Sequence, residues 1–229
     1  MPPAISWRLL GGTLTAGGTC TILSFIYATR DIEFTPLEAL DPIFHSEHFK
    51  RCNPNGNPTI HDLHVQKVPL SRINPSLRAD HDKLLERYCG GVWGGLGFAP
   101  QRLLLTRAHK HEDDASPASL WTLTDLLASQ YNAGTDIAGH FEVVERSKKS
   151  ILIRGGDKIS NRGLRPMDGF IELSASMDPQ RDIVEFGCKT VFFQGLGESK
   201  KLPMPGPVIW LHELYAKALL ASGVRHVLG

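Results

Sequence analysis

Residues 169–193, GFIELSASMDPQRDIVEFGCKTVFF, decide the fold. Apolar and polar residues alternate on both sides of residues 177–180, and a period of two is the pattern of a half-buried strand. Since the Asp-Pro pair favours a tight turn, we predict an antiparallel hairpin of strands 169–176 and 183–193. The second strand has a charged face, which we expect to be solvated, and an apolar face, which we expect to line a core or a cavity. The apolar face carries Phe186, Cys188, Thr190 and Phe192.

The same alternation predicts three more strands, at residues 61–69, 140–146 and 150–154. Residues 147–149, 155–166 and 177–180 separate the later strands. In strand 61–69 the residues expected inside are Leu63, Val65 and Val68.

A long helix is predicted at the end of the chain. Three prolines between residues 203 and 207 break the preceding segment, and Pro207 suits the first turn of a helix. Apolar residues then recur at steps of three and four as far as Ser222, as on a helix that lies on an apolar surface. This stripe includes Leu211, Tyr215 and Ala218.

Short helices are expected earlier in the chain. Thr35 and Pro36 suit the start of a helix over residues 37–44, and residues 80–88 have a helical pattern. Residues 90–97, GGVWGGLG, hold five glycines, which could serve close helix packing or a phosphate-binding loop. The run lacks the preceding strand and the Gly-x-Gly-x-x-Gly spacing of a phosphate loop, so close packing is favoured.

Composition limits the classes of function. The 229 residues carry a formal net charge of +1, and the densest basic runs are pairs, which argues against nucleic-acid binding. Four widely spaced cysteines without a Cys-x-x-Cys pair favour a reducing, intracellular setting, either cytoplasmic or membrane-associated. Histidine pairs such as His61 and His64 do not have zinc-site spacing, so we expect neither a metal nor a cofactor.

The N-terminal residues 9–29 carry no charge and could span a bilayer by length. Four glycines and five threonines lower their hydropathy, however. Three interpretations stay open: a weak membrane anchor, a buried strand or helix of the fold, and a disordered lead.

The order of short helices, antiparallel strands and a long last helix resembles the START-like (SRPBCC, Bet v 1-type) helix-grip superfamily. The similarity covers roughly residues 60–228 and is carried by residues 90–107, 141–154, 169–193 and 205–227. It implies an α+β fold in which a curved antiparallel sheet grips the C-terminal helix. Residues 35–229 would form the ligand-binding domain, after a hydrophobic segment at residues 1–34.

The resemblance also implies an internal cavity for a small hydrophobic ligand. By similarity to accessory proteins of fungal natural-product pathways, the expected function is a cofactor-independent cyclase, pericyclase or isomerase that acts on a polyketide or terpenoid intermediate. The alternative is a non-catalytic carrier of a lipid or hydrophobic metabolite.

The superfamily shares no catalytic residue, so candidates come from residue type and position. The Tyr215 hydroxyl is expected to reach the pocket, and His140 could act as a general base if it points inward. Arg154 and Asp157 belong to a charged loop that could stabilise a bound carbonyl at the cavity mouth. The alternatives are structural roles: core packing for Tyr215, strand-end hydrogen bonding for His140, and solvated ion pairs in the loop.

Aromatic and small residues are expected to line the pocket and to hold a reactive conformer of the substrate, although most could equally be plain core. The predicted substrate-binding residues are Trp93, Trp121, Phe141, Phe170, Phe186, Cys188, Thr190, Phe192, Leu211 and Ala218.

Overall fold

The computed structural model describes residues 23–109 and 119–229. The chain divides into two compact units, Met1–Asp31 and Ile32–Gly229. In the first unit residues 23–29 are helical, and residues 9–22 of the hydrophobic N-terminal segment lie outside the described residues. Every helix in the described part of the chain is too short or too polar to cross a membrane.

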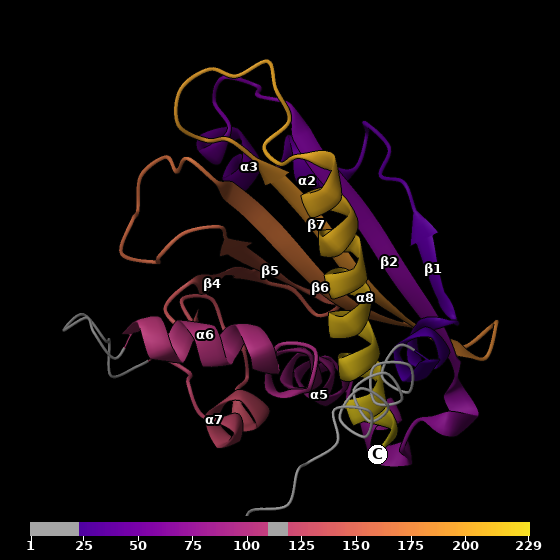
Figure 1. Cartoon of the computed structure of the whole chain (residues 1–229). Helices are drawn as coiled ribbons and strands as arrows, with labels where there is room; N and C mark the ends of the chain where they lie inside the picture. Colours follow the sequence, from indigo (N-terminus) through magenta and orange to yellow (C-terminus); the bar gives the residue numbers. More distant parts are fainter. Residues whose placement is uncertain (1–22, 110–118) are drawn as a thin grey trace, which may run out of the picture. The chain divides into compact units, whose positions relative to one another are not determined.

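The second unit is built on one curved antiparallel sheet with the strand order β1-β2-β7-β6-β5-β4-β3 (Figure 1). The predicted hairpin is confirmed, with Asp178 of one strand paired to Ile183 of the next. The three other predicted strands are also present, within a few residues of their expected ends. The strands are β1 (Ile32–Thr35), β2 (Thr59–Pro69), β3 (Asp136–Ile137), β4 (Phe141–Arg146), β5 (Ser150–Gly155), β6 (Asp168–Asp178) and β7 (Ile183–Phe193).

The long C-terminal helix is confirmed, with a proline in its first turn. The helix predicted over residues 37–44 starts too early, because the helix that follows β1 begins at Pro42, where the Asp41 carboxylate accepts a hydrogen bond from the Ile43 N–H at 3.0 Å. The helices are α2 (Pro42–His45), α3 (Glu47–Cys52), α4 (Pro75–Ala79), α5 (His81–Gly94), α6 (Ala99–His109), α7 (Leu123–Ala128) and α8 (Gly206–Leu228), with a 3-10 turn, η1, at Leu70–Arg72.

Both faces of the sheet are covered (Figure 1). The inner face packs against α5 and α8, and the main core lies there. The outer face carries a second apolar cluster in which Ile43 of α2 and Cys52 of α3 contact Val191 and Phe193. The expectation that the charged face of β7 is solvated is therefore confirmed at Glu185, which is exposed, and wrong at Lys189. Lys189 is largely buried and forms ion pairs with Asp41 and Glu172.

Helices α5 and α8 touch through glycines. A Cβ atom added at Gly91 would lie 3.0 Å from the Gly223 Cα and 2.4 Å from the His226 Cβ. No larger residue fits this distance without moving one helix. Close packing is thus confirmed as the role of Gly91 in the glycine run.

The two halves of α8 are held differently. Residues 216–228 include six buried residues, whereas residues 206–215 include none. Trp210 and Leu211 in the first half are 63% and 60% exposed. The sheet therefore grips the second half of α8 tightly and leaves the first half open on its outward side.

Candidate functional site

A group of buried polar side chains lies on the inner face of the sheet, beneath the first half of α8. Asp62 on β2 and Thr190 on β7 are directly paired across the two strands. The Thr190 hydroxyl donates a hydrogen bond to Asp62 Oδ1 at 2.8 Å. His212 reaches them from α8, with its Nε2 3.0 Å from Thr190 Oγ1 and 3.4 Å from Asp62 Oδ2. We call Asp62, His64, Thr190 and His212 the inner polar cluster.

These contacts keep the Asp62 carboxylate ionised. Burial alone would raise the pKa of Asp62, but its partners His212, His64 and Thr190 more than offset this and hold the pKa well below the ordinary range. Because the ionised carboxylate and the Thr190 oxygen act as acceptors, a neutral His212 carries its proton on Nε2. Its Nδ1 lone pair then has no hydrogen-bond partner among the described residues. The Phe192 ring packs edge-on against His212, with centroids 4.8 Å apart, and limits rotation of the imidazole.

Two members of the cluster have buried polar atoms without a hydrogen-bond partner among the described residues. His64 is fully buried, and neither of its ring nitrogens has a partner among the described residues. Its Nδ1 lies 3.5 Å from Asp62 Oδ1, too far for a good hydrogen bond. Asp62 Oδ2 also accepts no hydrogen bond from any residue that the structure describes. Leaving such a group unsatisfied costs about 1–3 kcal/mol, so the site favours a bound polar group that can pair with it.

Tyr215 lies one helical turn after His212 on α8. Its hydroxyl donates a hydrogen bond to Gln101 Oε1 on α6 at 2.5 Å. Burial raises the pKa of Tyr215, so the phenol stays protonated and remains a donor at neutral pH. Of the four predicted catalytic residues, Tyr215 is the one that lies near the inner polar cluster in the described part of the chain.

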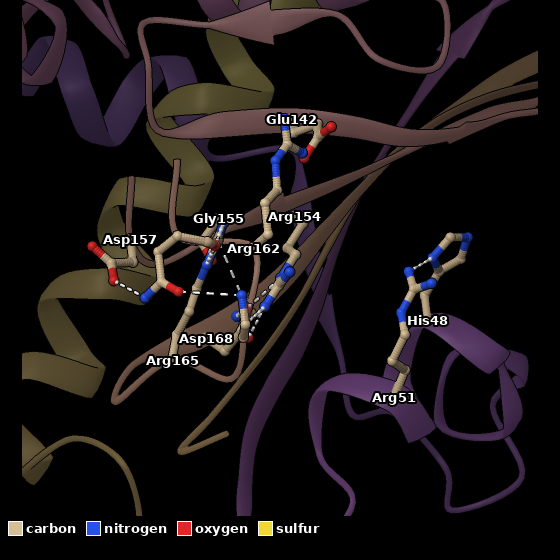
Figure 2. Close-up of polar contacts among 12 residues, drawn as sticks. His48, Arg51, Glu142, Arg154, Gly155, Asp157, Arg162, Arg165 and Asp168 are labelled. Atoms are coloured by element: carbon tan, nitrogen blue, oxygen red, sulfur yellow. Dashed lines mark hydrogen bonds and ion pairs between the residues drawn. The ribbon is translucent and has the colours of Figure 1, made fainter. Parts of the chain in front are cut away.

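The three other predicted catalytic residues lie elsewhere. Arg154 points to the outer face, where its Nε and Nη2 contact the Asp168 carboxylate at 3.0 and 2.6 Å (Figure 2). Asp157 organises its own loop: a hydrogen bond from the Asn161 amide, ahead of one from the backbone, lowers its pKa. His140 is partly buried, and its Nδ1 lies 3.2 Å from the Ala138 carbonyl oxygen. No contact between described residues joins these three to His212 or Tyr215.

The predicted substrate-binding residues lie in several different places, and only a few of them are near the inner polar cluster. Thr190 belongs to the inner polar cluster and Phe192 packs against it, whereas Leu211 is exposed to solvent. Ala218 lies beside Gly97: a Cβ atom added at Gly97 would lie 2.7 Å from the Ala218 carbonyl oxygen. The remaining inner-face residues, which pack in the main core rather than around a cleft, are Trp93, Trp121, Phe141, Phe186 and Cys188.

Phe170 is separate from that set, because it lies on the outer face against Phe193, with ring centroids 6.0 Å apart. Described residues line four clefts. Among the predicted substrate-binding residues, only Phe170 lines one of these four clefts.

Sequence reasoning missed Asp62, His64 and His212. The pattern in β2 suggested that Leu63, Val65 and Val68 lie inside, and this is confirmed for Val68, which is buried in the main core. It is wrong about which residues face α8 near the cluster: the strand register places Asp62 and His64 on the inner face, opposite Thr190 and Cys188. Since both faces of β2 are covered, alternation alone cannot decide which set of residues faces α8. A usable signal was present in α8, where His212 is three residues from Tyr215 and so shares its face.

The chain matches no protein-family model, no curated protein and no solved structure. The described residues contain no group of three or more His, Cys, Asp or Glu side chains suited to a metal ion.

Proposed function

We propose that this protein is a cofactor-independent isomerase or cyclase that acts on a hydrophobic small molecule bearing a carbonyl group. The observation that carries the proposal is the buried Asp62–His212 pair, in which a carboxylate orients an imidazole and leaves one of its nitrogens free. This arrangement is suited to general acid–base catalysis, because the carboxylate also stabilises the imidazolium that forms.

The chemistry follows from the positions of two side chains on α8. His212 Nδ1 removes a proton from the carbon next to the carbonyl, and the electron pair moves onto the carbonyl oxygen. The Tyr215 hydroxyl exchanges Gln101 for that oxygen and stabilises its negative charge by a hydrogen bond. If a double bond lies beside that carbon, His212 returns the proton to its far end, which moves the double bond. Alternatively, the enolate carbon attacks a second carbonyl carbon of the same molecule and closes a ring, and the alkoxide that forms takes the proton back from His212.

The loosely held half of α8 supports this placement of the substrate. Residues 206–215 have no buried member, so lifting this half away from β2 and β7 breaks few apolar contacts. Phe192 would offer an aromatic surface to the ligand beside the polar groups of the cluster. The same arrangement, a sheet that grips a long terminal helix, supports the proposal that the chain belongs to the START-like superfamily.

Proton exchange tests the function without knowledge of the natural substrate. Hydrophobic ketones incubated with the protein in D₂O should take up deuterium next to the carbonyl, which NMR detects directly. His212→Gln should slow this exchange by about a hundredfold or more, because general acid–base catalysis contributes that much. Tyr215→Phe should also slow it, and by a smaller factor.

His48→Gln is the matched control, since His48 lies on α3 at the outer face. The His48→Gln variant should catalyse deuterium uptake by the ketones at the wild-type rate. Exchange that survives His212→Gln contradicts the proposal. Ketones that are retained by the protein without any exchange would instead indicate a carrier.

A further inference from the structure

A second site candidate lies on the opposite side of the sheet. A cleft of about 410 Å³ opens on the outer face, between α3 and strands β4 to β6. We call it the outer cleft. Figure 2 shows His48 and Arg51 of α3 apart from the strand residues that form its other wall. The residues of the walls that matter here are His48, Arg51, Glu142, Arg154, Arg162 and Phe170.

Arg154 is held rigidly at the base of this cleft. Its Nε and Nη2 bind both oxygens of Asp168, and Nη2 also donates to the Gly163 carbonyl at 2.7 Å. The side chain is nearly buried, so its orientation is fixed before any ligand arrives. Its Nη1 has no acceptor among the described residues, although Arg154 lines the cleft. A guanidinium with one pair of N–H groups unused is a ready donor for an oxyanion.

The charge behind the cleft is not balanced. Arg165 is fully buried beside Arg154, and its guanidinium donates to the carbonyls of Gly155, Lys158 and Asn161. Its nearest buried carboxylate is again Asp168, at 4.0 Å. Two buried arginines therefore share one carboxylate. Burial and the charge of Arg154 lower the pKa of Arg165, the direction expected where positive charge is in excess.

The rim adds two more cations and a single acid. Arg51 is exposed, with its Nη2 3.3 Å from His48 Nδ1, and Arg162 is paired with Glu142 at 2.5 Å. Arg51 contacts no carboxylate among the described residues, and Glu145 pairs with His48 rather than with an arginine. An anion in the cleft would thus meet Arg154 at the base and Arg51 and Arg162 at the rim.

We infer that the outer cleft binds the carboxylate or phosphate group of a small organic anion, whose apolar part lies against Phe170 and Val144. This site is independent of the proposed acid–base function, because it lies on the other face of the sheet. A ligand held there touches α3, β4 and β5 together and would stabilise their packing.

Two probes with the same ring distinguish the anionic groups: phenyl phosphate and benzoate, with benzyl alcohol as the neutral control. Titration followed by backbone amide NMR should show saturable shifts at residues 48–52, 142–144 and 162–165 for one or both anions and none for benzyl alcohol. The double variant of Arg51→Gln and Arg162→Gln should weaken binding by about tenfold or more, since charge-assisted hydrogen bonds are lost. Both side chains are exposed, so the fold should survive.

Arg181→Gln is the matched control, because Arg181 is an exposed arginine in the turn between β6 and β7. It removes one positive charge from the surface, as each of the two substitutions in the double variant does, and should leave the affinity unchanged. Shifts that are absent for both anions, or that are also produced by sodium chloride at equal ionic strength, overturn the inference. Equal weakening by Arg181→Gln overturns it as well, because it would show that net charge alone attracts the probes.

Discussion

The buried carboxylate of Asp62 links the stability of this protein to pH. Its pKa in the folded state is depressed, so between that value and the unfolded value of about 4 the unfolded chain binds more protons. The stabilisation from Asp62 is therefore fully present above about pH 5 and is lost as pH falls through the folded pKa. Urea unfolding should show a free energy of unfolding that declines steadily below about pH 4.

Asp62→Asn should remove much of this decline and cost about 1–3 kcal/mol at neutral pH, because it weakens the buried hydrogen bond from Thr190 and removes the negative charge that lies 3.4 Å from His212 Nε2. Glu185→Gln, at an exposed position on β7, serves as the control and should keep the wild-type pH profile. A profile of Asp62→Asn that runs parallel to the wild type would show that other carboxylates cause the acid sensitivity.

Two phenylalanines on the same face of β7 should differ in their contribution to stability. Phe186 is fully buried against Tyr88, with ring centroids 5.1 Å apart, so Phe186→Ala should cost about 3–5 kcal/mol. Phe192 is only partly buried beneath the open half of α8, so Phe192→Ala should cost about half of that or less. Equal losses in chemical denaturation would mean that the first half of α8 covers the sheet as tightly as the second.

The close contact between α5 and α8 depends on Gly91 and not on the neighbouring Gly90. Gly91→Ala places a Cβ 2.4 Å from the His226 Cβ, so the helices must separate, at a cost of about 1–3 kcal/mol. At Gly90 the nearest atom to an added Cβ is the Leu127 Cα at 3.5 Å, an ordinary contact. Gly90→Ala should therefore be neutral or stabilise the helix by up to about 1 kcal/mol. Thermal unfolding of the two variants compares them directly, and equal destabilisation would contradict the close-contact explanation.

The elements differ in how far the sequence predicts them. The β6–β7 hairpin and α8 follow from local signals, namely alternation around an Asp-Pro turn and an apolar stripe after three prolines. The first helix was misplaced because Thr35-Pro36 and Asp41-Pro42 carry the same start signal, and only the Asp41 side chain caps a helix. The inner polar cluster could not be predicted, because the side of β2 that faces α8 is set by pairing with β7, which is distant in sequence.

The outer cleft shows the same limit. Arg154 and Asp168 stand at the ends of neighbouring strands in the pattern, which predicts a charged group there. The face to which the group points depends on α3, whose packing on the outer face brings Cys52 against Phe193 and Phe170. Contacts of this kind arise from tertiary packing, and no periodicity in a single segment encodes them.

The two halves of α8 should differ in how often their backbone hydrogen bonds open, because only the second half carries buried side chains. Amide hydrogens in residues 219–224 lie where α8 packs on α5, so they should exchange only in large openings of the fold. Amides in residues 210–215 belong to the half without buried side chains and should exchange at least about tenfold faster. A hydrophobic ketone that binds beneath this half should slow exchange at 210–215 and leave 219–224 unchanged. Equal protection of both halves of α8 would mean that the first half does not move away from β2 and β7 by itself. The substrate would then have no route to His212.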